Sequence, residues 1–137
     1  MRLVLVLCMY LICGQAALAA EWVPYSESNE GDKSYLDAES ITVRGDKRIA
    51  WTKVEKAAPV AYEGGVLSSW MALIEVDCKA KTQRTISEVG YHPDGSMLYQ
   101  FPEQNKASAV VPESVGEIRL EAMCKRTPRT RRRLEGK

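Results

Sequence analysis

The stretch Trp70-Met71-Ala72-Leu73-Ile74-Glu75-Val76-Asp77-Cys78 is the longest apolar run in the chain after its N-terminal leader. Its even-numbered positions are apolar throughout and end in the cysteine, whereas its odd-numbered positions change from two apolar residues to two acids. Because successive side chains of a strand point to opposite faces, this pattern predicts a central strand with one wholly apolar face. Cys78 should lie where that face meets its packing partner.

The rest of the chain has the composition of one small globular domain. It has 137 residues, of which 45% are hydrophobic and 27% charged, so a single core is expected. The net charge of +1 conceals an uneven distribution. Residues 125–137 hold seven Lys or Arg and one acid, whereas residues 21–124 hold eleven basic residues and seventeen acids. An acidic body with a basic tail argues against a nucleic-acid-binding domain.

Residues 1–20 have the features of a secretory signal peptide. Arg2 precedes a short apolar core over residues 3–12, and Ala17-Leu18-Ala19 fits the small-x-small cleavage rule. A membrane anchor is the alternative, but the apolar run is about half of the roughly 20 residues that a span requires. We therefore expect export, to the periplasm, the cell surface or the medium, with no transmembrane segment after cleavage.

The residues before Cys13 resemble a lipoprotein signal. The residue before a lipidated cysteine should be small, however, and here it is Ile12, which argues against lipidation at Cys13.

Cleavage of the leader would leave two cysteines, Cys78 and Cys124. In an oxidising compartment two cysteines have one possible pairing, so we expect a disulfide that closes a loop of about 46 residues. Metal binding is the rival use, but two cysteines without CxxC spacing and one distant histidine make a poor site. The sequence gives no metal or cofactor motif.

Residues 114–125 carry the strongest helix signal. Ser114 and Glu117 fit a capping box, in which the serine hydroxyl accepts the third backbone N–H and the glutamate reaches back. The predicted apolar stripe consists of Val115, Ile118 and Ala122, with Leu120, Met123 and Cys124 to one side. Residues 125–137 show no apolar periodicity and are expected to be disordered.

The remaining segments alternate between strand and turn patterns. We predict an α+β fold with about six antiparallel strands and one C-terminal helix tethered by a disulfide. Pro24 places the first strand at an edge, and a kink is expected near residues 38–40. Residues 57–65, which contain Pro59 and two glycines, are predicted to form a mobile loop. The expected strands are residues 21–25, 34–43, 48–55, 70–78, 82–91 and 97–101, with a further short strand at 109–111.

Groups that could perform catalysis do not converge in the sequence. The single histidine, His92, lies in a Pro-Asp-Gly turn, where a solvated turn residue is the simpler interpretation. Glu75, Asp77 and Glu88 could form a carboxylate pair across neighbouring strands, but they also fit a solvated sheet face. We expect no enzymatic activity.

Three further features of the sequence are compatible with a binding role. Arg44-Gly45-Asp46 is an integrin-type tripeptide at a predicted hairpin tip, although turn chemistry alone explains Gly-Asp there. The basic tail could contact anionic lipids or polyanions, or simply aid solubility. Trp22, Trp51 and Trp70 could form a stacking surface, but one tryptophan per strand favours core anchors.

Short motifs in a fixed order resemble the surface-adhesin E-like family of small exported bacterial proteins. The similarity extends over residues 22–124 and includes the cysteine pair. The matching segments are Trp22, Tyr35-Leu36-Asp37, Ser40-Ile41, Ile49-Ala50-Trp51, Ile74-Glu75-Val76-Asp77-Cys78-Lys79, Arg84, Tyr91, Asp94-Gly95 and Pro112-Glu113-Ser114-Val115-Gly116-Glu117.

The resemblance implies an antiparallel sheet with a C-terminal helix tethered through Cys78 and Cys124, and kinship with an adhesin for host matrix proteins. The leading hypothesis is a non-enzymatic envelope protein that binds a protein or envelope macromolecule. The alternative is a periplasmic small-ligand-binding or stress-related module, in which residues 57–65 gate a pocket. An apolar cavity between sheet and helix would favour the alternative. Which residues bind a partner is left open by the sequence.

Overall fold

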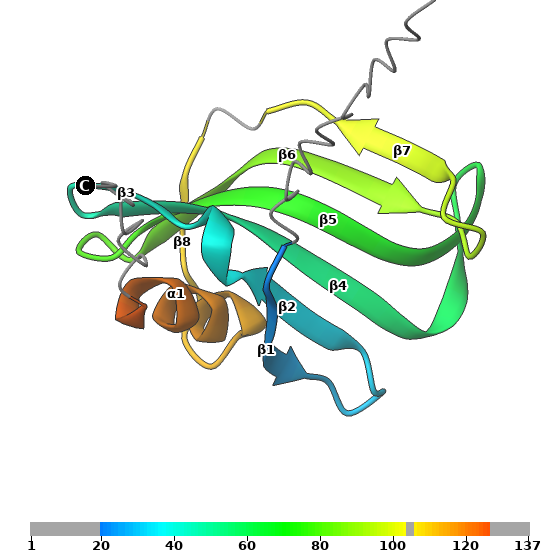
Figure 1. The fold of residues 1–137 in the computed structure, drawn as a ribbon, viewed down its shortest axis with the longest axis horizontal. Helices are drawn as coiled ribbons and strands as arrows, with labels where there is room; N and C mark the ends of the chain where they lie inside the picture. Colours follow the sequence, from blue (N-terminus) through cyan, green and yellow to red (C-terminus); the bar gives the residue numbers. More distant parts are fainter. Residues whose placement is uncertain (1–19, 104–105, 127–137) are drawn as a thin grey trace, which may run out of the picture.

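A computed structural model describes residues 20–103 and 106–126. One antiparallel sheet forms the body of the molecule, and a single helix lies across one end of it (Figure 1). The elements are β1 (Trp22–Glu27), β2 (Lys33–Asp37), the 3-10 helix η1 (Ala38–Ser40), β3 (Thr42–Arg44), β4 (Lys47–Tyr62), β5 (Gly65–Asp77), β6 (Thr82–Tyr91), β7 (Met97–Phe101), β8 (Ser108–Ala109) and α1 (Val115–Lys125).

The sheet has the order β1-β2-β4-β5-β6-β7, with β3 paired to β4 and β8 paired to β6. The α+β prediction is confirmed, but the described residues form eight strands rather than about six. The predicted strand over residues 34–43 is divided by η1, since the Asp37 carboxylate accepts the Glu39 N–H at 3.1 Å and turns the chain. β8 contributes a further two residues. β1 lies at an edge, as Pro24 indicated.

The prediction of a mobile loop over residues 57–65 is wrong. β4 continues to Tyr62, β5 begins at Gly65, and the two form one long hairpin. Pro59 is accommodated because the β4–β5 register shifts between Glu55 and Val60, and irregular pairing of this kind needs no proline N–H. Gly64 supplies the positive φ of 82° in the turn.

The face of β5 predicted to be apolar packs the core. Ala72, Ile74 and Val76 are no more than 3% exposed and cluster with Leu36 of β2 and Met123 of α1. Alternation along the strand therefore places Met71 and Leu73 on the opposite face. The core lies between this central strand and the helix, as the sequence predicted.

The helix bounds are confirmed, but its buried stripe is not the predicted one. Leu120 and Met123 face the sheet, whereas Val115 and Ile118 are 48% and 44% exposed. Both sets are helically periodic, so periodicity alone could not distinguish them. Glu117 donates its N–H to the Ser114 hydroxyl as predicted, but its own carboxylate accepts the Glu113 N–H.

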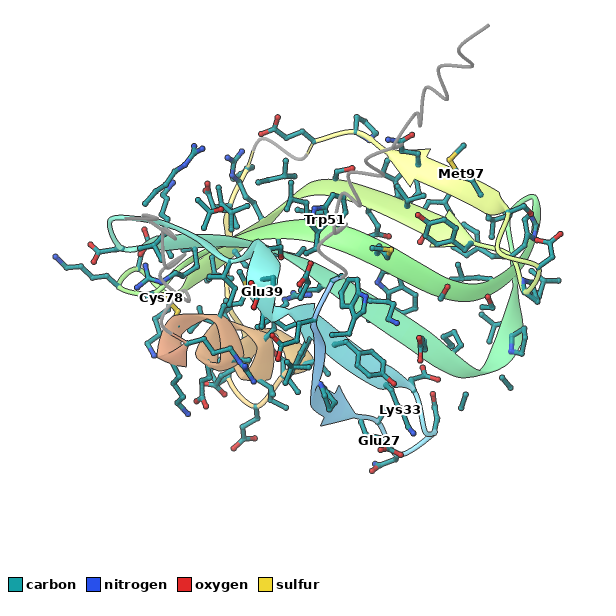
Figure 2. The ribbon with its side chains drawn as sticks, viewed as in Figure 1. Glu27, Lys33, Glu39, Trp51, Cys78 and Met97 are labelled. Carbon is teal, nitrogen blue, oxygen red and sulfur yellow. A yellow bond between two sulfur atoms is a disulfide. The ribbon has the colours of Figure 1, made fainter. Side chains whose placement is uncertain are left out.

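Cys78 and Cys124 form a disulfide, with their Cα atoms 5.9 Å apart. Figure 2 shows Cys78 beside α1, at the end of the sheet that the helix covers. The bond fixes the last turn of an eleven-residue helix to the end of β5. Helices of this length are marginal in isolation, so the crosslink and the core contacts hold α1 in place.

Residues 1–19 of the predicted signal peptide, with Cys13, and residues 127–137 of the basic tail lie outside the described residues. Lys125, which was also predicted to belong to the disordered tail, is the last residue of α1. Among the residues that the structure does describe, no helix is long and apolar enough to cross a membrane.

Candidate functional site

The groups considered for catalysis are not brought together. His92 begins a turn in which its N–H donates to the Ser96 carbonyl at 2.9 Å. The nearby Asp94 carboxylate accepts the Ser96 N–H and hydroxyl, at 2.9 and 2.6 Å, and these bonds lower the pKa of Asp94. In the described part of the chain the imidazole has no hydrogen bond to a carboxylate, so no triad is present.

The three candidate carboxylates each have a separate structural partner. Glu75 binds Arg84 and Lys47 at 2.9 and 3.1 Å. Asp77 accepts the Lys79 and Ala80 N–H groups in the β5–β6 turn. Glu88 accepts the Tyr99 hydroxyl at 2.9 Å, and its pairing with Ala72 places it on the helix side of the sheet. They do not form a catalytic pair.

The sheet face opposite α1 carries a broad band of partly exposed aromatic and apolar side chains. We call this band the outer face. Cross-strand register aligns Tyr35 with Lys53, Lys53 with Met71, and Met71 with Val89. None of the band's members is fully buried, and α1 packs against the other face of the sheet. The outer face comprises Trp22, Tyr35, Trp51, Lys53, Met71, Leu73 and Val89.

The tryptophans therefore differ from the predicted core anchors. None of the three is among the buried core residues. Trp51 pairs with Leu73 on the outer face, and Figure 2 shows it over the middle of the sheet. Trp22 lies on the same face at the β1 edge, whereas Trp70 lies on the helix side.

Lys53 organises one side of the outer face. Its ammonium lies 5.0 Å from the Trp22 ring centroid and 4.8 Å from that of Tyr35, distances that suit cation–π attraction. It also pairs with Glu55 at 2.7 Å, which holds the pKa of that carboxyl below its usual range. Two rings from two strands are thus arranged around one cation.

The alternation along β4 predicts that Trp51, Lys53 and Glu55 share one face of the sheet. It does not predict which aromatic rings of the neighbouring strands contact Lys53.

A hollow of about 260 Å³ lies between the start of α1 and the sheet. Its walls include Val54, Trp70 and Val115, and its polar groups include Tyr25 and Arg119. The Tyr25 hydroxyl and Arg119 Nε are buried without a hydrogen-bond partner, while Arg119 Nη2 donates to Gln83 at 2.6 Å. Burial raises the pKa of Tyr25, against the opposing effect of the nearby Arg119 cation.

The hollow has one cationic side chain, Arg119, and one carboxylate, Asp32, in its lining. The Asp32 carboxylate pairs with Lys56 and accepts the Ala57 N–H. These bonds lower the pKa of Asp32. The Arg119 charge therefore has no carboxylate partner among the lining residues. The sequence did not indicate Tyr25 and Arg119 as a pair, because they belong to β1 and α1 and are brought together only by the fold.

The tripeptide Arg44-Gly45-Asp46 occupies the tip of the β3–β4 hairpin, as predicted, and all three residues are exposed. The hairpin lies at the same end of the sheet as Cys78, because the Cys78 N–H donates to the Asp46 carbonyl at 2.9 Å.

The described residues form one antiparallel sheet with a disulfide-tethered helix, and the catalytic candidates do not converge in them. The model of the surface-adhesin protein E family matches residues 22–125, and the chain belongs to that family. The match spans the sheet, the helix and both bonded cysteines. No curated protein matches the chain.

Proposed function

We propose that this protein is an exported, non-enzymatic envelope adhesin that binds a protein partner, with host extracellular-matrix proteins as the first candidates. The observation that carries the proposal is the outer face. It is a broad aromatic and apolar surface opposite a helix that a disulfide holds to the other side of the sheet. Family membership agrees with a surface role.

The composition of the outer face supports a protein partner rather than a small molecule. Aromatic residues and Met are enriched at protein interfaces, whereas small ligands bind in concave pockets. Trp22, Tyr35, Trp51 and Met71 supply these residue types from four strands. Lys53, already held between two rings, loses little side-chain entropy when a partner covers it.

The test is a pull-down with the full-length chain, produced in an oxidising compartment and immobilised. Solubilised matrix proteins are applied at micromolar concentration, and the retained proteins are identified by mass. Retention of a matrix protein that elutes on competition with free chain is the expected result. An empty eluate would contradict the proposal. Cell fractionation with the mass of the mature N-terminus tests export and cleavage separately.

A second candidate function rests on the hollow beneath α1. Its one uncompensated cation, its buried hydroxyl and its apolar wall favour a small anion with an apolar body. Benzoate and the isosteric, neutral benzamide are suitable probes, observed through the indole resonance of Trp70. If the hollow binds such anions, benzoate shifts that resonance, benzamide does not, and Arg119→Gln removes the effect. Equal responses to both probes would eliminate this function.

A further inference from the structure

The β3–β4 hairpin presents its tripeptide on a backbone of defined shape. Arg44 pairs directly with Lys47, so the turn has two central residues, Gly45 and Asp46. Gly45 has φ +60° and Asp46 does not have positive φ. Positive φ at the first central position alone defines a type II′ turn, which is one of the two turns that suit hairpins and places glycine there. The local sequence therefore selects this turn.

Both central carbonyl groups of the turn are bonded. Arg48 Nη1 donates to the Gly45 carbonyl at 2.9 Å. The Cys78 N–H donates to the Asp46 carbonyl, and Cys78 is itself bonded to Cys124. The tip is thus fastened to the end of β5 and, through the disulfide, to α1. A binding loop fixed in this way loses little conformational entropy on association.

The two charged side chains at the tip are available to a partner. Arg44 and Asp46 are exposed, and within residues 20–103 and 106–126 neither side chain makes a hydrogen bond or an ion pair. The neighbouring cation, Lys47, is instead engaged by Glu75 at 3.1 Å. No heavy atom outside the adjacent residues lies within 4 Å of a Cβ built on Gly45. A guanidinium and a carboxylate therefore flank an open glycine.

We propose that Arg44-Gly45-Asp46 binds a cell-surface receptor of the Arg-Gly-Asp-recognising, integrin class. This inference rests on the proposed adhesive function and assigns it a second partner, at a site separate from the outer face. The Asp46 carboxylate would ligate a divalent cation held by the receptor, because carboxylate oxygens are the ligands that such hard cations prefer. The Arg44 guanidinium would bind an acidic pocket through charge-assisted hydrogen bonds.

The turn also explains why the site needs glycine. A side chain at Gly45 would have to adopt φ +60°, which L-residues rarely do. The geometry is therefore specific in two ways: the centre of the turn is open, and its backbone is fixed by hydrogen bonds.

The test measures binding of a purified Arg-Gly-Asp-binding integrin ectodomain to the immobilised full-length chain in Mn²⁺. We expect saturable binding that is lost on chelation with EDTA and displaced by a linear Gly-Arg-Gly-Asp-Ser peptide. Asp46→Glu keeps the charge but moves the carboxylate by one methylene, and should weaken binding by at least about tenfold. Arg44→Gln should weaken it comparably. The matched control is Glu63→Asp at the tip of the β4–β5 hairpin, which should bind as wild type.

The inference is overturned if the wild-type chain does not bind the ectodomain in Mn²⁺, or if Asp46→Glu binds as tightly as wild type. All three variants alter exposed turn or strand-end residues, and their thermal midpoints should match that of the wild type. The matrix-protein pull-down serves as the second arm. Matrix binding that persists in Asp46→Glu leaves the outer-face proposal standing whatever the integrin result, and integrin binding without matrix binding would overturn only the proposed function.

Discussion

The backbone N–H of Cys78 donates to the carbonyl oxygen of Asp46 at 2.9 Å. The side chain of the same Cys78 is bonded to Cys124. One residue thus joins the hairpin tip, the end of the central strand and the last turn of the helix. Three elements that are far apart in the sequence are therefore connected through Cys78.

Removing the disulfide should destabilise the whole domain. The bond spans 46 residues, and a loop of that size contributes about 4 kcal/mol in the chain-entropy model. We expect the double variant Cys78→Ser with Cys124→Ser to unfold at correspondingly lower urea concentration. Wild-type protein under reducing conditions is the control and should behave like the variant. Identical urea midpoints for oxidised and reduced protein would contradict this role of the bond.

The helix face can be tested by two truncations on α1. Met123 is fully buried, whereas Ile118 is 44% exposed. Met123→Ala should cost about 2–5 kcal/mol of unfolding free energy, and Ile118→Ala should cost about 0.5 kcal/mol or less, as surface changes do. Equal losses measured by urea unfolding would contradict the assignment of Met123 to the buried face and of Ile118 to the exposed face.

Gly90 is required by the ring of Tyr99 on the neighbouring strand. A Cβ on Gly90 would lie 2.2 Å from a ring carbon of Tyr99, whose hydroxyl donates to Glu88. Gly90→Ala should cost about 1–3 kcal/mol, because the ring must move. In a Tyr99→Ala background the same change should be neutral or stabilising, since alanine reduces the entropy of the unfolded chain. A cost that is unchanged in that background would exclude the ring as its cause.

The Glu75 ion pairs should make stability pH-dependent at acid pH. Hydrogen bonds from Arg84 and Lys47 hold the pKa of Glu75 below its usual range, against the opposing effect of burial. A carboxyl whose pKa is lower in the folded state stabilises the protein above its unfolded pKa, about 4.3, and loses that contribution as pH falls through the folded value.

The stability difference between wild type and Glu75→Gln should therefore be constant from about pH 7 to about pH 5 and shrink below about pH 4. Urea unfolding at each pH provides the measurement, and the shared titration of other groups cancels in the difference. A stability difference that grows on acidification would show that the pKa of Glu75 is not lowered by folding.

Sequence patterns predicted the scaffold well where one signal had no competitor. Alternation over residues 70–78 identified the central strand, and Ser114 identified the helix start. The prediction of the buried helix face was wrong because Val115 and Ile118 are spaced as regularly as Leu120 and Met123. Cys124 could have distinguished the two faces, since the face next to the disulfide must be the buried one.

The candidate surfaces were harder to predict because they depend on register. Lys53 gains its rings from β1 and β2, and nothing local to β4 specifies either partner. Proline and glycine near residues 57–65 indicated a loop, yet a register shift allowed the strand to continue past Pro59. The β3–β4 hairpin tip was predicted correctly, because the type of a turn depends on only four consecutive residues.

We propose that the outer face is the surface that binds a protein partner. The most direct test is the dissociation constant of the matrix protein retained in the pull-down, measured for Met71→Glu and for Ile118→Glu. Both variants place a carboxylate at an apolar position that reaches solvent, one on the outer face and one on the exposed side of α1. We expect that Met71→Glu weakens binding by at least about tenfold and that Ile118→Glu leaves the dissociation constant unchanged. Wild-type affinity in Met71→Glu, in a chain with an unchanged thermal midpoint, would contradict the proposal.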